Sequence, residues 1–276
     1  MIQFSVDDKR CIRCGLCVSD CPSRIIEREG DAVPRVRPEQ EALCIQCQHC
    51  LAVCPEAAVS VLGRKPEDSL PLTADTFPKL DQMLRFVRGR RSIRHYRDEN
   101  VDPARIRQLL AALGNVPTGV NRRELTFSVI DDKAAMQRLR EKVLAALADA
   151  TKANRIPERF VYLTQAAPAY YDRGIDIIFR TAPHALIISA PPDAPCPQQD
   201  VALALAYFEL LAQSAGLGTV WWGMLSMVLA LMPEFKPLLG LERKDVFYGM
   251  LFGIPSIRFP RAVQRDDGAK VRQLNL

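Results

Sequence analysis

The sequence of 276 residues lacks several features that mark common functional classes. Residues 1–8 contain no apolar segment, so neither a signal peptide nor a transit peptide is expected. No GxGxxG motif opens a helix after a strand, and the glycines at 216, 218 and 223 do not match its spacing. A Rossmann dinucleotide site is therefore not indicated. The sequence has no internal repeat apart from one doubled cysteine pattern.

Neither the charge nor the hydrophobicity of the chain is extreme. The net charge of +5 divides into −2 over residues 1–62 and +7 over residues 63–276, which is too modest to indicate a nucleic-acid partner. The segment 210–232 has 23 residues without a charge, which is long enough for a membrane span. Three glycines and several polar side chains interrupt it. A buried helix, a turn, a strand and a second helix are predicted there instead.

Eight of the nine cysteines form two runs with identical spacing. The first run is Cys11-x-x-Cys14-x-x-Cys17-x-x-x-Cys21-Pro22, and 33 positions later comes Cys44-x-x-Cys47-x-x-Cys50-x-x-x-Cys54-Pro55. Structural zinc sites use CxxC pairs with a longer spacer, and disulfides need an oxidising compartment, so both alternatives fit poorly. Three thiolates at every third position can wrap one tight loop around three corners of an Fe4S4 cube.

This spacing is that of bacterial two-cluster ferredoxins, which about the first 60 residues resemble. The resemblance implies that three cysteines of each run and the last cysteine of the other run bind one [4Fe–4S] cluster. The implied ligand sets are Cys11, Cys14, Cys17 and Cys54 for one cluster, and Cys21, Cys44, Cys47 and Cys50 for the other. Oxygen-sensitive clusters and reduced thiols predict a cytoplasmic protein. The ninth cysteine, Cys196, is predicted to be an uninvolved thiol.

The chain is long enough for two domains. A ferredoxin domain is expected over residues 1–62 with a closing strand at 57–62, a linker rich in helix breakers over 63–76, and a second domain over 77–276. In the second domain, helices are predicted from 77 to 89, from Pro103 after an Asp102 cap, from Asp132, and over 200–215. Strands are predicted over 126–130, 185–190, 219–222 and 246–252. This irregular alternation predicts an α+β sandwich with helices on both faces of a central sheet.

The second domain contains an ordered set of motifs rich in arginine and glycine. They are Arg90-Arg91-Ser92-Ile93-Arg94, Pro117-Thr118-Gly119-Val120-Asn121, Gly216 to Gly223, and Gly253-Ile254-Pro255 followed by Arg258 and Arg261. The set resembles the FMN-dependent nitroreductase family over residues 80–276. That resemblance implies an intertwined homodimer with FMN at the subunit interface. Two departures are Arg122-Arg123-Glu124-Leu125 where the family often has Gln-Pro-Trp, and Ala262-Val263 where x-Pro often follows the late arginine.

The residue types in these motifs suit a flavin. Arginine forks and a hydroxyl provide charge-assisted hydrogen bonds to a phosphate. The residues expected at the phosphate and ribityl chain are Arg90, Arg91 and Ser92, with Arg261 completing the clamp and Arg258 as its reserve. Those expected at the ring system are Arg94 near N1 and O2, Pro117 and Thr118 in the loop that meets the ring, Asn121 at the pyrimidine edge, and the main chain of Gly223 and Met224 near N5.

Together, these features predict an enzyme, a flavin-dependent oxidoreductase. Electrons would pass from two [4Fe–4S] clusters to FMN and on to a small organic acceptor, with nitro-compound reduction as the first choice. Alternatives are an activated alkene or halogenated aromatic as the acceptor, or an electron relay that serves a partner protein. The expected donor is a low-potential one, reduced ferredoxin or NAD(P)H. The six arginines between Arg85 and Arg97 leave nucleic-acid binding as a third, disfavoured hypothesis, because FMN would require the same arginines.

Overall fold

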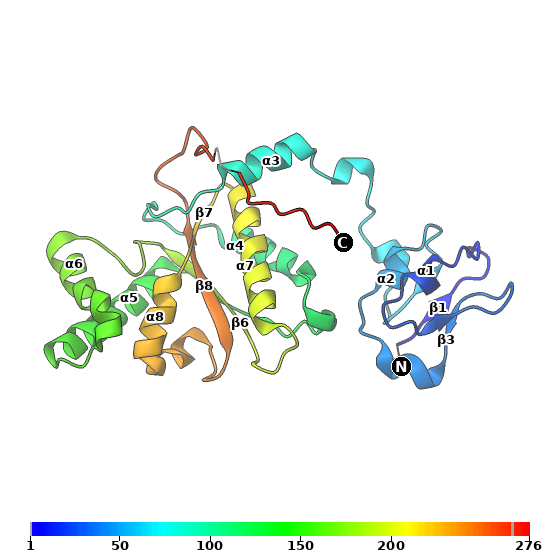
Figure 1. The fold of residues 1–276 in the computed structure, drawn as a ribbon, viewed down its shortest axis with the longest axis horizontal. Helices are drawn as coiled ribbons and strands as arrows, with labels where there is room; N and C mark the ends of the chain where they lie inside the picture. Colours follow the sequence, from blue (N-terminus) through cyan, green and yellow to red (C-terminus); the bar gives the residue numbers. More distant parts are fainter. Residues whose placement is uncertain (1, 266–267) are drawn as a thin grey trace. The chain divides into compact units, whose positions relative to one another are not determined.

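The computed structural model describes residues 2–265 and 268–276, which form two compact units (Figure 1). The first unit is Met1–Pro78 together with Val120–Arg122, and the second is Lys79–Gly119 together with Arg123–Leu276. Among the residues that the structure describes, no helix has the length and apolar character required to cross a membrane.

The first unit contains very little regular secondary structure. Its elements are the strands β1 (Ser5–Val6), β2 (Ile26–Glu27), β3 (Arg35–Val36) and β4 (Val59–Ser60), the one-turn helices α1 (Leu16–Ser19) and α2 (His49–Ala52), and the 3-10 segments η1 (Pro38–Leu43), η2 (Pro66–Asp68) and η3 (Ala74–Thr76). β1 pairs antiparallel with β4, and β2 with β3. The strand predicted over 57–62 is shorter because Ala57 and Leu62 adopt left-handed φ angles of 48° and 57°.

The second unit is built on one four-stranded antiparallel sheet. In spatial order its strands are β5 (Thr126–Ile130), β6 (His184–Ala190), β8 (Val246–Gly253) and β7 (Gly218–Trp221). All four predicted strands are confirmed to within one residue at each end. β6 is buried along its whole length, which explains why its sequence is almost continuously apolar rather than alternating.

Helices cover both faces of this sheet (Figure 1). The helices that follow α3 (Leu80–Gly89), which does not cover the sheet, are α4 (Pro103–Ala112), α5 (Lys133–Lys152), α6 (Ala166–Arg173), α7 (Pro197–Ser214) and α8 (Gly223–Leu231). The 3-10 segments are η4 (Leu113–Asn115), η5 (Gly119–Asn121), η6 (Glu158–Gln165), η7 (Pro233–Phe235) and η8 (Pro237–Leu239). Ala185 and Ile187 of β6 face a core that contains α5 and α8, whereas Leu186 and Ile188 face a core that contains α4 and α7. The α+β sandwich predicted from the sequence is therefore confirmed.

Two predicted helix boundaries were wrong. The helix expected from residue 77 begins at Leu80, because Pro78 keeps the preceding Phe77 in an extended conformation. The helix expected from Asp200 begins at Pro197, since proline at the first helical position is already fixed in a helical φ. Asp200 is instead buried in the first turns of α7, where its carboxylate accepts a hydrogen bond from the Gly119 N–H at 3.0 Å.

The buried histidine of β6, His184, makes the stability of the second unit depend on pH. Its side chain is fully buried, and Nε2 accepts a hydrogen bond from the Val101 N–H at 2.9 Å, so the neutral ring is required. Burial lowers the pKa of His184 below its ordinary value. The unfolded chain therefore binds a proton below about pH 6.5 that the native chain excludes, and the free energy of unfolding falls as the pH is lowered.

We predict that His184→Gln removes this component of the pH dependence, which is at most about 1.4 kcal/mol per pH unit, while its amide oxygen still accepts from Val101. The measurement is denaturant unfolding of wild type and variant between pH 7.5 and pH 5, with His95→Gln at an exposed histidine as the control. Identical slopes for wild type and His184→Gln would contradict the prediction.

Candidate cofactor sites

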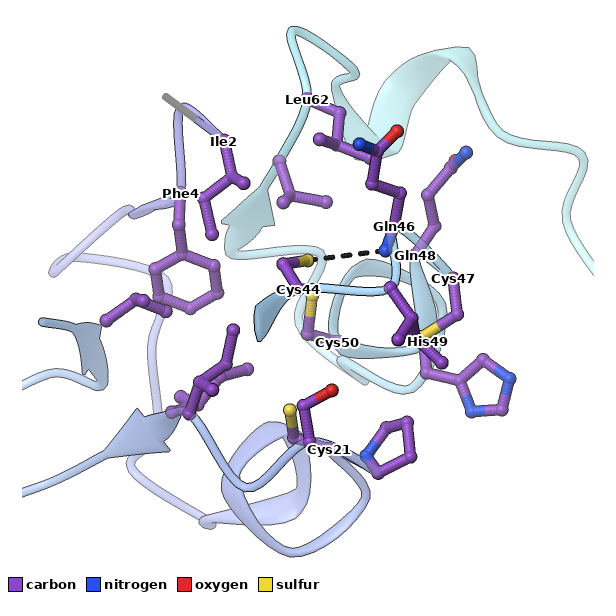
Figure 2. A pocket seen from close by; sticks show the side chains of 17 residues that line it. Ile2, Phe4, Cys21, Cys44, Gln46, Cys47, Gln48, His49, Cys50 and Leu62 are labelled. Atoms are coloured by element: carbon purple, nitrogen blue, oxygen red, sulfur yellow. Dashed lines mark hydrogen bonds between the residues drawn. The ribbon is translucent and has the colours of Figure 1, made fainter. Parts of the chain in front are cut away.

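A hollow in the first unit is lined by four of the paired cysteines, Cys21, Cys44, Cys47 and Cys50. Figure 2 shows these cysteines around the hollow, with Ile2 and Phe4 on its apolar side. A second hollow is lined by the other four, Cys11, Cys14, Cys17 and Cys54. Each hollow therefore combines three cysteines of one run with the last cysteine of the other, which are the two sets that the sequence predicts.

The backbone around the two hollows repeats with the same 33-residue offset as the cysteines. Arg13 and Gln46 take left-handed φ angles of 59° and 55°, and Gly15 and Gln48 take 76° and 60°. A third pair, Arg24 and Ala57, follows the two Cys-Pro steps with φ angles of 53° and 48°. Such angles are costly for residues other than glycine and persist where the surroundings impose them. Here they curl each loop so that its three sulfurs face inward.

The donor set fits iron–sulfur clusters rather than single ions. Among residues 2–265 and 268–276, no three His, Cys, Asp or Glu side chains are arranged to hold one metal ion. In a cubane cluster each thiolate binds a different iron, so the sulfurs surround a volume instead of converging on a point. Backbone N–H groups of Gln46 and Ala58 donate to the sulfurs of Cys44 and Cys54 at 3.4 and 3.3 Å, the type of bond that tunes cluster potentials.

Burial disfavours the thiolate form of one cysteine in each hollow, Cys50 and Cys17. Burial, and after it the neighbouring Cys47 and Cys44 groups, raise the pKa of the Cys50 thiol to about 11. Burial also raises the pKa of Cys17, followed by the charges of Cys54 and Cys11. Since only thiolates bind iron, the metal must supply the charge that offsets this repulsion.

The second unit has a cavity of about 480 Å³ lined by three arginines, Arg91, Arg97 and Arg258. The rest of its wall includes Gln213 near the end of α7, Gly218 and Thr219 at the start of β7, and Ile254 and Phe259 after β8. Ile93 N–H donates to the Thr219 carbonyl at 2.8 Å, which joins the arginine-rich segment to the edge of the sheet. Gly218 is required at this approach, since a Cβ there would lie 2.7 Å from Ile93.

Among the residues that line the cavity, Arg91 has the hydrogen-bond donor best suited to bind an anion. Its Nε is buried and has no hydrogen-bond partner within the described part of the chain, while Nη2 donates to the Arg88 carbonyl at 3.1 Å. A buried guanidinium N–H without an acceptor is costly. Three arginines on the cavity wall, of which Arg97 also pairs with Glu99, and an unused buried donor therefore fit the phosphate and ribityl end of a flavin mononucleotide.

The other predicted flavin residues lie in different surroundings. Arg90 pairs with the buried Glu209, with Nη1 and Oε1 at 3.1 Å. Arg94 is exposed and its Nη1 donates to the Ser92 carbonyl at 3.4 Å. Arg261 is exposed and is not among the residues that line the cavity, whereas Arg258 is.

The loop after Pro117 is strained and firmly held. Thr118 Oγ1 accepts from the Arg123 N–H at 3.0 Å. Val120 has a φ of 45°, an outlier for a β-branched residue. Asn121 belongs to the first unit, within which its Nδ2 donates to the Ile45 carbonyl at 2.8 Å.

The first turn of α8 contains Gly223 and Met224. A Cβ at Gly223 would lie 2.9 Å from the Tyr248 hydroxyl, so glycine allows the close contact there.

Sequence reasoning missed several residues that line the arginine cavity. Arg97 closes the run of six arginines, but its spacing from the Arg-x-Ser-x-Arg motif gave no reason to select it. Gln213 is separated from that motif by more than 100 residues and reaches the cavity because its Nε2 donates to the Phe86 carbonyl at 2.9 Å. The run of six arginines between Arg85 and Arg97 was the sequence signal that could have pointed to Arg97.

Comparison with protein families identifies both parts of the chain. Residues 87–254, more than half of the sequence, match the profile of the nitroreductase family. The chain belongs to the nitroreductase family. In addition, residues 10–59 match the 4Fe-4S dicluster domain. No curated protein sequence matches this nitroreductase-family chain.

Solved structures share the fold of the nitroreductase part. An FMN-bound nitroreductase from Bacteroides fragilis has a TM-score of 0.55 at 17% identity, covering 70% of this chain and 99% of its own. An FMN-bound nitroreductase from Desulfitobacterium hafniense also has a TM-score of 0.55, at 21% identity, covering 71% and 100%. An FMN-dependent nitroreductase from Clostridium difficile has 0.52 at 18% identity, covering 71% and 100%.

The crossed pairing of the cysteine runs can be tested through iron content. We expect about eight irons per chain from two clusters, falling by up to four in Cys11→Ala because one complete ligand set survives. Adding Cys54→Ala to Cys11→Ala should remove little further iron, since both belong to one hollow, whereas adding Cys44→Ala should abolish both clusters.

Iron and acid-labile sulfide in anaerobically purified protein are the measurements, and Cys196→Ala is the control outside both hollows. The crossed pairing is wrong if Cys54→Ala instead adds nothing to Cys44→Ala.

Proposed function

We propose that this protein is an FMN-dependent oxidoreductase in which two [4Fe–4S] clusters deliver electrons to a flavin that reduces a small organic acceptor, a nitro compound in the first instance. The observation that carries the proposal is the presence of a dicluster domain match and a nitroreductase family match in one chain. The FMN bound by the structurally similar nitroreductases of Bacteroides fragilis and Desulfitobacterium hafniense supports the choice of flavin. When bound, FMN accepts electrons singly and releases them as a pair, which one-electron carriers cannot do.

The residues of the chain have distinct tasks in this proposal. The two crossed cysteine sets hold the clusters, and the N–H groups of Gln46 and Ala58 donate to ligand sulfurs. Arg91 and Arg258 bind the FMN phosphate in the arginine cavity. The roles of Ser92, Arg94, Pro117, Thr118, Asn121, Gly223, Met224 and Arg261 toward FMN remain predictions from the sequence.

The proposal is tested by following flavin and cluster absorbance separately after anaerobic reduction. Reduced protein mixed with a nitroaromatic should show flavin reoxidation that is faster than cluster reoxidation in the same trace. Comparing NADH, NADPH and reduced ferredoxin as reductants identifies the donor. If the nitroaromatic leaves the flavin rate unchanged, the enzyme assignment fails and the flavin is a relay for a partner protein.

Cys54→Ala is the matched variant for this experiment. Loss of one cluster should slow flavin reduction by ferredoxin at least tenfold while leaving the reaction of the reduced flavin with the nitroaromatic unchanged. Equal slowing of both steps would indicate general damage rather than a broken electron path.

We also propose that the protein is a homodimer. α3 has an uncovered apolar face, with Leu80 at 74% exposure, Leu84 at 46% and Val87 at 50%, and α7 exposes Leu203 and Tyr207. An apolar stripe on an otherwise polar helix requires a partner surface, and a second copy provides one by symmetry.

Leu84→Glu should therefore shift the gel-filtration mass from about twice 30.9 kDa toward the monomer value. Gln82→Glu adds the same charge to the same helix and retains an acceptor for the Lys79 N–H, so it should remain dimeric. A wild-type mass near that of the monomer would count against the dimer.

A further inference from the structure

The peptide group between Ile45 and Gln46, beside the hollow of Figure 2, has a hydrogen-bond partner on each side. Its N–H, on Gln46, donates to the sulfur of Cys44 at 3.4 Å, the bond drawn in Figure 2. Its carbonyl, on Ile45, accepts from Asn121 Nδ2 at 2.8 Å. The N–H and C=O of one trans peptide bond are coplanar and point in opposite directions. Asn121 therefore fixes the plane of the peptide group whose N–H is directed at a cysteine sulfur.

The donor to this peptide group comes from a distant part of the sequence. Asn121 lies 76 residues after Ile45 and falls inside the nitroreductase match, not the dicluster match. The segment Val120–Arg122 nevertheless belongs to the first compact unit. Val120 and Asn121 have left-handed φ angles of 45° and 56°. A conformation of this kind persists where the surrounding contacts impose it, and the bond to Ile45 is one such contact.

The equivalent turn of the first cysteine run is held by a residue of the run itself. Arg13 takes the place of Gln46 there, with the same left-handed conformation. Its Nη1 donates to the Cys11 carbonyl at 3.0 Å, and its Nε donates to the Asp31 carbonyl at 2.5 Å. In the second run a glutamine stands at this position, and the loop is held by Asn121. The two hollows therefore share a cysteine pattern but differ in this support.

The two bonds of the Ile45–Gln46 peptide group act in series. A donor to the carbonyl polarises the peptide group, which makes its N–H a stronger donor to the Cys44 sulfur. Such a donor stabilises negative charge on the sulfur. Because a reduced cluster carries one more negative charge than the oxidised cluster, the bond favours the reduced form and raises the reduction potential.

The cluster expected in the hollow of Figure 2, called the second cluster below, has the ligand set Cys21, Cys44, Cys47 and Cys50. We propose that Asn121 is a positioning residue for the second cluster, and that its hydrogen bond to Ile45 raises the reduction potential of that cluster. The bond uses one of two amide hydrogens, so it is compatible with the role toward FMN that the sequence predicts for Asn121. The proposal rests on the two clusters of the proposed function and adds a residue of the nitroreductase match that controls one of them.

The test is an anaerobic redox titration of the holoprotein, followed by electron paramagnetic resonance and visible absorbance. Asn121→Gly removes the donor and places at this position the residue that adopts the left-handed region most readily. At one fixed ambient potential, the ratio of reduced to oxidised second cluster should fall about fivefold, as expected when one hydrogen bond is weakened. The other cluster should keep its potential.

Cysteine variants show which of the two clusters has shifted. In Cys54→Ala the ligand set of the second cluster is complete, so adding Asn121→Gly should still lower the potential. In Cys21→Ala the other ligand set is complete, so adding Asn121→Gly should have no effect.

Two further variants separate the hydrogen bond from the shape of the segment. Asn121→Asp keeps the side-chain shape but replaces the donor by an acceptor with a negative charge, so it should shift the potential in the same direction and at least as far. Val120→Ala changes the neighbouring residue and retains Asn121, so both clusters should keep their potentials.

Unchanged potentials in Asn121→Gly protein with full iron and sulfide would overturn the inference while leaving the proposed function intact. An equal shift of both clusters, or a shift that persists in Cys21→Ala, would also overturn it. A selective loss of four irons in Asn121→Gly, with all iron retained in Val120→Ala, would support the positioning of the loop by Asn121. Wild-type protein without iron and sulfide would remove the proposed function as well.

Discussion

The first unit depends on the arrangement of four thiolates around each of two small hollows. Its strands are two residues long, its α-helices span one turn, and the larger buried aliphatic side chains among residues 2–78 are few, namely Ile2, Ile25, Ile26, Leu51, Val59 and Val61. Such a core is too small to offset the conformational entropy of about 78 residues. Cluster binding by the eight paired cysteines is therefore expected to contribute folding free energy to this unit. The three pairs of left-handed residues, offset by 33 positions, serve the same end, because they turn each loop around the hollow that its sulfurs line.

The second unit is stabilised by a sheet with an apolar core on each face, and this sheet supports a local group of arginine side chains. The sheet is covered on both faces, and its central strand β6 is fully buried. At the edge of that sheet, beyond β7, Arg91 and its neighbours converge on one cavity. Of the arginines that line this cavity, Arg97 pairs with Glu99 at 3.5 Å, whereas Arg90, which does not line it, pairs with the buried Glu209. A bound phosphate would offset the charges of Arg91 and Arg258, so ligand binding should stabilise this unit by mass action.

The sequence predicted the parts of this protein that depend on local patterns. Thr126–Ile130 alternates, Asp102 caps α4 through the Ala104 N–H, and the cysteine spacing groups the sulfurs correctly around the hollows. What it missed depends on long-range packing. The partners of Glu209 lie 119 residues before it and 12 residues after it, and no local pattern relates them. For the same reason, Arg90 and Arg91 seemed equivalent as sequence neighbours, although the structure gives one a carboxylate and the other a cavity.

The two units share one electrostatic principle. In each, the chain gathers groups of like charge, thiolates in the first and guanidinium groups in the second, where they repel one another unless a group of opposite charge is bound. The scaffolds differ because the required precision differs. Iron–thiolate bonds are strong enough to fix the sulfurs directly, whereas hydrogen bonds to a phosphate are individually weaker and need donors that are already oriented. A unit with a small core can therefore hold the clusters, whereas under the proposed function a flavin phosphate would require donors that a packed sheet holds in place.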